Sequence, residues 1–252
     1  MHRSDNIQRI RKRILEITDS GVLQQAANII LNRSLGFLCL SALFSINRKE
    51  RMKQTILLED AESLFASSIH FPLEIQDGGI AGSVCLGLFY YLTGQFEKSY
   101  NVLVPTAQTS LMHLQKGLWY FLQQPIRIYT EKNRFLNSPQ FFVEDVVLRG
   151  LFEQLHIHVL VEFDPLVLCA YIMYKIKQTE ENAALFELAC DNVHRCKTRT
   201  NKEIDYLRLN LRDSSGDKTP QDIPCNQCDY FDLIKETKPL NLPKDPRLDN
   251  QN

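Results

Sequence analysis

The stretch "LGLFYYLTGQFEKSY", residues 86–100, constrains the fold of this chain more than any other feature. Two segments with apolar residues three and four positions apart are separated by Gly94, with only a few residues in which to turn. This periodicity is typical of amphipathic helices, and a short turn makes two such helices pack against each other as an αα-hairpin. Gly87 on the first segment and Ser99 on the second are small, so we expect the two backbones to approach closely there.

Similar segments fill much of the chain, and proline and glycine mark the breaks between them. The residues 126–130 and 156–163 are rich in β-branched side chains, so short strands are an alternative there, although we favour helix. The sequence therefore predicts an all-α fold. The expected helices cover residues 7–17, 22–31, 35–46, 57–69, 81–93, 96–104, 111–123, 143–160, 165–177, 180–194 and 202–211.

The hairpin at Gly94 resembles a tetratricopeptide repeat, although Ser99 stands where that family usually has alanine. A degenerate second copy covers residues 165–192, and residues 58–72 resemble the second helix of an earlier unit, whose partner would be the helix at 35–46. Other αα-solenoids fit the same pattern, because the copies depart from the family's regular period. The matching positions are Leu86, Gly87, Tyr90, Gly94, Phe96, Ser99 and Leu103 in the clear copy, Leu166, Ala170, Met173, Asn182, Phe186 and Ala189 in the second, and Ala61, Phe65 and Ser68 in the earlier unit.

The resemblance implies a solenoid of stacked hairpins, whose first helices line a concave groove that binds peptides or helices of other proteins. Aromatic side chains with polar tips are favoured contact residues at such surfaces. By the resemblance, the partner-binding positions are Val84, Leu88, Tyr91, Val167, Tyr171, Tyr174 and Lys175.

Composition argues against two classes of partner. The formal net charge is −1, so no global positive field is available to hold a nucleic acid. The longest uncharged apolar stretch has 13 residues, from Ser34 to Ile46, whereas a membrane-spanning helix needs about 20. The seven cysteines include several within apolar runs, which suits a reducing compartment, and we expect a cytoplasmic protein.

A metal site is the alternative that belongs to another functional class. Cys225 and Cys228 form a CxxC pair, but no further zinc ligands follow at a matching spacing, so whether they bind zinc stays open. His156 and His158 would share one face of a strand and diverge on a helix, so the pair could hold a metal only in the strand conformation. A metal-binding enzyme or regulatory subunit that uses these residues is therefore the alternative function.

The sequence predicts three regions. Residues 1–34 form basic amphipathic helices, residues 35–212 form the helical-repeat array, and residues 213–252 form a disordered tail that is rich in proline and charge. We expect a protein-interaction adaptor or scaffold with no catalytic residues, no cofactor and no bound metal. Its partner would be a protein or peptide rather than a nucleic acid.

Overall fold

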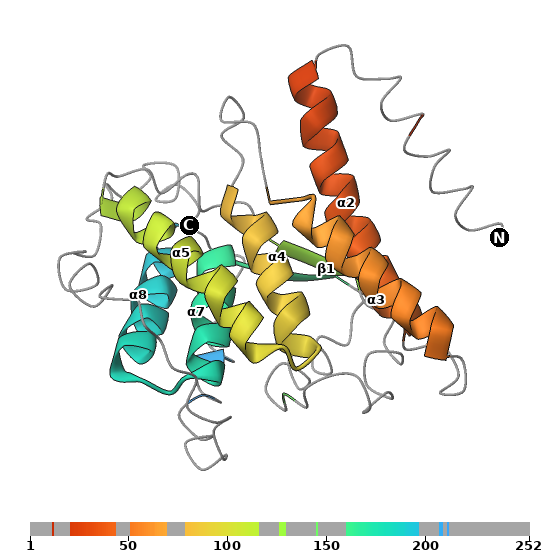
Figure 1. Ribbon diagram of the computed structural model, residues 1–252. Coiled ribbons are helices and arrows are strands. Elements are labelled where there is room, and N and C mark those ends of the chain that lie inside the picture. The colour runs from red at the N-terminus through yellow and green to blue at the C-terminus, as the bar shows by residue number, and fades with distance from the viewer. Residues whose placement is uncertain are drawn as a thin grey trace.

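The computed structural model describes residues 12, 21–43, 51–69, 79–115, 126–129, 145, 160–196, 207, 208 and 211. Helices dominate this part of the chain, as the sequence predicts (Figure 1). Consecutive helices pack in pairs: α2 with α3, α4 with α5, and α7 with α8. Their bounds are α2 Gly21–Leu43, α3 Arg51–Ala66, α4 Gly79–Leu92, α5 Phe96–Gln115, α7 Pro165–Ile176 and α8 Glu180–Cys196.

The turn between α4 and α5 confirms the hairpin predicted at Gly94. Gly94 has a φ of 76°, a left-handed conformation that glycine adopts without the steric penalty of a side chain. Its N–H donates to the carbonyl of Tyr91 at 3.0 Å, and the N–H of Gln95 donates to the carbonyl of Tyr90 at 2.8 Å. These two bonds satisfy carbonyls at the end of α4 that lack helical partners, so the glycine both ends the helix and starts the reversal.

The close approach predicted between Gly87 and Ser99 is also present. The Ser99 hydroxyl, which is fully buried, donates to the backbone carbonyl of Gly87 at 2.8 Å. A Cβ atom added to Gly87 would clash with the side chain of Leu103, reaching within 2.6 Å of its Cγ. Serine at the position of the expected alanine therefore supplies a hydrogen bond between the two helices as well as a small side chain.

Two predicted helix breaks are wrong. The helix α5 continues through Pro105 to Gln115, although proline cannot donate to the carbonyl of Asn101. Asn101 and Pro105 are both exposed, so the unpaired carbonyl lies on the accessible side of the helix, where water can satisfy it. The helix α2 likewise runs without interruption through residues 32–34, where the sequence predicts a break between two helices.

Two short strands occur in the segments for which the sequence allowed strand as the alternative to helix. The strands β1 (Ile126–Tyr129) and β2 (Leu160–Phe163) pair antiparallel, with Ile126 opposite Phe163. Ile126 and Phe163 are both buried, so this end of the ribbon belongs to the core. Of the helix predicted over 143–160, only residues 145 and 160 are described, and Leu160 lies in a strand.

The helix α7 begins at Pro165, as predicted. Asp164 caps it: its carboxylate accepts from the backbone N–H of Leu166 at 2.9 Å and of Val167 at 3.2 Å. Proline at the first helical position suits this geometry, because its missing N–H would have no helical partner. The chain thus passes directly from β2 into the first helix of the third hairpin.

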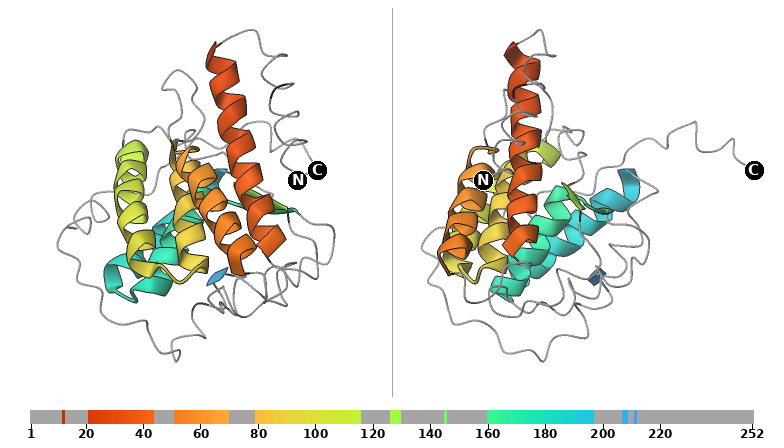
Figure 2. Two further views of the ribbon diagram at one scale, coloured as in Figure 1. Left: turned by 45° about the vertical axis from the view of Figure 1, so that its right-hand side comes forward. Right: turned by 90° about the vertical axis from the view of Figure 1, so that its right-hand side faces the viewer.

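The three hairpins contact one another in chain order. The helix α4 contacts both α2 and α3, and α7 contacts both α4 and α5. Figure 2 shows α2, α3, α4 and α5 side by side, with the N-terminal part of α2 projecting beyond the others. Between the first two hairpins, the Tyr90 hydroxyl donates to Glu62 at 2.7 Å, and Lys98 lies 3.5 Å from the same carboxylate. The first helix of each later hairpin therefore packs on both helices of the hairpin before it.

No helix in the described part of the chain is long and apolar enough to cross a membrane. The predicted N-terminal helix at 7–17, apart from Lys12, and the predicted tail at 213–252 lie outside the described residues.

Three described residues lie beyond α8. Leu207 and Leu211 are buried, and Arg208 pairs with Glu187 of α8 at 3.1 Å.

Candidate functional site

The predicted partner-binding residues lie on α4 and α7, two helices that contact each other. Most of these side chains are in the core rather than on an open surface: Tyr174 and Lys175 are partly exposed, whereas the others are nearly inaccessible. In this conformation, only Tyr174 and Lys175 can touch a partner. The buried members of the set are Val84, Leu88, Tyr91, Val167 and Tyr171, each at most 3% exposed.

Two of these tyrosines share a hydrogen-bond partner, a buried carboxylate. The Tyr91 hydroxyl donates to Asp145 Oδ2 at 2.7 Å, and the Tyr171 hydroxyl lies 2.8 Å from Oδ1 and 2.9 Å from Oδ2 of the same residue. Tyr91 belongs to α4 and Tyr171 to α7, whereas Asp145 lies in sequence between β1 and β2. One carboxylate from outside the helices thus joins the first helices of two hairpins. We call these three residues the tyrosine–aspartate cluster.

The hydroxyl proton of Tyr91 is firmly held. Burial raises the pKa of Tyr91 well above its ordinary value, and the charge of Asp145 and its hydrogen bond raise this pKa further. Tyr91 therefore stays protonated at neutral pH and remains a donor. Hydrogen bonds to a carboxylate are among the strong ones in proteins, so the cluster fixes its three residues relative to one another.

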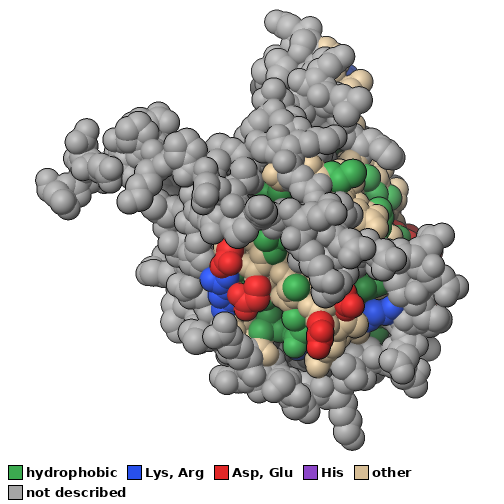
Figure 3. All heavy atoms as spheres, turned by 90° about the vertical axis from the view of Figure 1, so that its left-hand side faces the viewer, with side chains coloured by type: hydrophobic (Ala, Val, Ile, Leu, Met, Phe, Trp, Pro, Cys, Tyr) green, Lys and Arg blue, Asp and Glu red, His purple; other side chains and the backbone are tan. Residues whose placement is uncertain are grey.

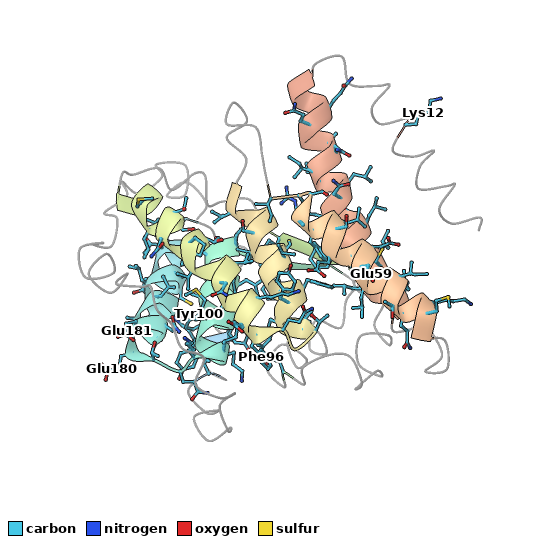
Figure 4. The ribbon with its side chains drawn as sticks, in the orientation of Figure 1. Lys12, Glu59, Phe96, Tyr100, Glu180 and Glu181 are labelled. Atoms are coloured by element: carbon cyan, nitrogen blue, oxygen red, sulfur yellow. The ribbon has the colours of Figure 1, made fainter. Side chains whose placement is uncertain are left out.

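Each tyrosine of the cluster is supported by an aromatic ring from the second helix of its own hairpin. The ring of Tyr91 lies 5.9 Å from that of Phe96 on α5, and the ring of Tyr171 lies 6.3 Å from that of Phe186 on α8. Figure 4 shows Phe96 at the start of α5, beside the turn that follows α4. The hairpins themselves therefore help to set the positions of the two hydroxyls.

Further contacts of the C-terminal end of α7 hold the third hairpin together and join it to the second. The Asn182 amide, fully buried, donates to the carbonyls of Lys177 at 2.8 Å and Met173 at 3.2 Å, which lie at the C-terminal end of α7. The Lys177 ammonium lies 4.5 Å from the centre of the Tyr100 ring on α5, a cation–π contact. Asparagine thus stands where the repeat pattern has a small residue because it satisfies the end of the preceding helix.

The residues of the alternative metal site lie outside the described part of the structure. No group of three or more histidine, cysteine, aspartate or glutamate side chains suited to a metal occurs among the described residues. His156, His158, Cys225 and Cys228 all lie outside them. The structure therefore leaves the metal alternative as a prediction.

The four cysteines whose side chains the structure describes have the properties of packing residues. Cys39, Cys85, Cys169 and Cys190 are free thiols in or against the core. Burial raises the pKa of Cys39 to about 11 and that of Cys85 to about 12. Burial also raises the pKa of Cys169 and of Cys190. Nucleophilic cysteines need a lowered pKa, so none of these four thiols is activated for covalent chemistry.

The accessible surface on the α5 and α8 side is mixed in character. Figure 3 shows the described acidic and basic side chains of this side in small groups among hydrophobic and neutral ones. Glu187 of α8 lies against Arg208, so acidic and basic charges partly compensate there. The described residues of this face thus form no extended basic surface of the kind that binds nucleic acid.

Asp145 is the member of the cluster that sequence reasoning missed. The residues around it read "FFVEDVVLRG", an apolar run interrupted by Glu144 and Asp145. An acidic residue within such a run is a signal for a carboxylate with a specific partner, because burying a charge is costly unless it is hydrogen-bonded. Nothing in the sequence indicates that the partners are Tyr91 and Tyr171, which lie 54 and 26 residues away.

Comparison of the chain with protein-family models, with curated proteins and with solved structures found no match.

Proposed function

We propose that this protein is an adaptor that binds another protein through the stacked first helices of its hairpins, at the accessible C-terminal end of α7. The observation that supports this proposal is the packing order of the hairpins, in which α4 contacts α2 and α3, and α7 contacts α4 and α5. Stacked helical repeats pack in this way and present their first helices on a shared surface. The resemblance to tetratricopeptide repeats points to the same surface.

The accessible part of this surface is at Tyr174 and Lys175, near the end of α7. A tyrosine beside a lysine offers a partner an aromatic ring, a hydroxyl and a positive charge, which suits a peptide or helix with apolar and acidic side chains. We assign no catalytic residues to the protein. The free thiols of Cys39, Cys85, Cys169 and Cys190 suit the reducing environment of the cytoplasm, where we place its action.

The proposal is tested by affinity capture with the full chain as bait, in extract of the cells that produce it. We expect a protein to co-purify in amounts comparable to the bait, and Tyr174→Ala to reduce its recovery at least fivefold, as loss of a central contact residue does. Met112→Ala is the matched control, since Met112 is an exposed apolar residue on α5, which is not one of the first helices of the hairpins. Capture that neither variant changes would contradict the proposed surface, and capture of no protein would contradict the adaptor function.

A further inference from the structure

We propose that the exposed face of α3 binds a second copy of this chain, with the two α3 helices packed antiparallel about a two-fold axis near Ile56. Exposed apolar side chains gather on the first hairpin, as at many protein-interaction surfaces. Of the five large ones in the described part of the chain, four lie on this hairpin: Ile30 and Leu38 on α2, and Met52 and Ile56 on α3. The α3 pair stands among exposed charged residues, and these charges indicate what kind of surface it meets.

The spacing of the exposed residues on α3 places them on one side of the helix. Ile56 follows Met52 by four residues and precedes Ser63 by seven, so these three side chains share one face. Met52 is 79% exposed and Ile56 is 50% exposed. The opposite side of α3 carries Ala61 and Phe65, which are fully buried in the core. The apolar pair therefore faces away from the rest of the hairpin.

Two oppositely charged residues border this face. Lys53 and Asp60 are both exposed and lie two helical turns apart, so they share one flank of the face. A two-fold axis near Ile56 reverses the order of residues along the second helix, which places Lys53 of each copy opposite Asp60 of the other. The same axis places Met52 of each copy over Ser63 of the other, a large side chain over a small one. The face of α3 is thus complementary to its own reversed copy.

The charges also select the direction of the second helix. In a parallel pair, Lys53 would face Lys53 and Asp60 would face Asp60, and like charges set against each other are unfavourable. The antiparallel pair is therefore the arrangement that the charges favour. Because the contact involves one short helix from each copy, we expect a weak dimer, with a dissociation constant of about 10 to 100 µM. This inference goes beyond the proposed function and does not depend on it, since Tyr174 and Lys175 belong to α7.

Sedimentation equilibrium of the full chain, at concentrations on both sides of this dissociation constant, tests the dimer. We expect the average mass to rise with concentration toward twice that of the monomer. Asp60→Lys should weaken dimerisation at least tenfold, because Lys53 of each copy then faces a lysine. Glu180→Lys, an equal change of charge at an exposed residue of α8, is the control and should leave dimerisation unchanged. A wild type that stays monomeric at every concentration would overturn the proposal.

A mixture of two charge variants gives the sharpest test. Lys53→Asp alone should dimerise as poorly as Asp60→Lys alone, because each homodimer sets like charges together on both sides of the axis. A heterodimer of the two variants pairs opposite charges at both places, so the mixture should regain the affinity of the wild type to within about threefold. Ile56→Ser, at the centre of the contact, should weaken the wild-type dimer at least tenfold. No recovery in the mixture, or a dimer that Ile56→Ser leaves intact, would overturn the proposal.

The substituted side chains are exposed, so loss of the dimer is distinguishable from loss of the fold. We expect each variant to keep the helical circular dichroism and the melting temperature of the wild-type monomer, as substitutions at surface positions usually do. A dimer that both single charge variants preserve in full would show that the two copies meet elsewhere, and it too would overturn the proposal.

Discussion

Gly87→Leu is expected to lower the free energy of unfolding by about 3 kcal/mol or more, the upper end of the cost of overpacking a core. Gly87 lies where α4 and α5 cross, and even a Cβ atom there would come within 2.6 Å of Leu103 Cγ. A leucine must place three further carbon atoms in the same space, while Ser99 holds the two helices together by its bond to the Gly87 carbonyl. Chemical denaturation followed by circular dichroism measures the change.

Gly21→Leu is the matched control for this substitution. Gly21 begins α2, and a Cβ added to it would meet no atom within 4 Å. We expect its free energy of unfolding to change by less than about 0.5 kcal/mol, as at other surface positions away from special features. If Gly87→Leu were as stable as Gly21→Leu, the packing of the central hairpin described above would be incorrect.

Gly82→Ala is expected to be comparably destabilising, although it adds only one carbon atom. The added Cβ would clash with the Ser68 carbonyl oxygen, lie 2.8 Å from the carbonyl carbon and 3.0 Å from Ile69 Cα. All three are backbone atoms of the segment that ends the first hairpin, so they cannot move away by changing a rotamer. The expected loss is about 3 kcal/mol, which for a chain of this size corresponds to a fall in melting temperature of about 10 °C.

The sign of this effect is what makes it informative. In an open helix, alanine is favoured over glycine by up to about 1 kcal/mol, so Gly21→Ala should be neutral or slightly stabilising. Gly82→Ala should therefore lower the melting temperature, whereas its control should leave it unchanged or raise it slightly. A stabilising Gly82→Ala would show that the first and second hairpins do not meet at Ser68.

The central hairpin could be predicted because its signals are local. Gly94, the apolar spacing on both sides of it and the small residues Gly87 and Ser99 all lie within one short stretch, and each acts on its near neighbours in the chain. The break expected at Pro105 was wrong because a proline on an exposed helix face leaves only one carbonyl for water to satisfy. The residue type gives the tendency to end a helix, and the exposure of the helix face decides whether the helix ends there.

The burial of the α4 residues predicted to line a groove could not be foreseen from local signals. This helix is apolar on nearly all sides, so its sequence contains no polar face that would mark the surface of the protein. The assignment of Val84, Leu88 and Tyr91 to a groove came from the family pattern alone, and the structure buries all three. Asp145 was missed for a related reason, because its hydrogen bonds depend on long-range packing of α4 against α7.

The central claim, that a protein partner binds at the accessible C-terminal end of α7, is tested most directly by site-specific photocrosslinking. A photoreactive phenylalanine analogue replaces Tyr174 in one protein and Asn101, an exposed residue of α5, in another. After irradiation in extract, we expect position 174 to form a covalent adduct with the partner recovered by affinity capture, and position 101 to form none with it. An adduct with that partner at position 101, and none at position 174, would contradict the claim.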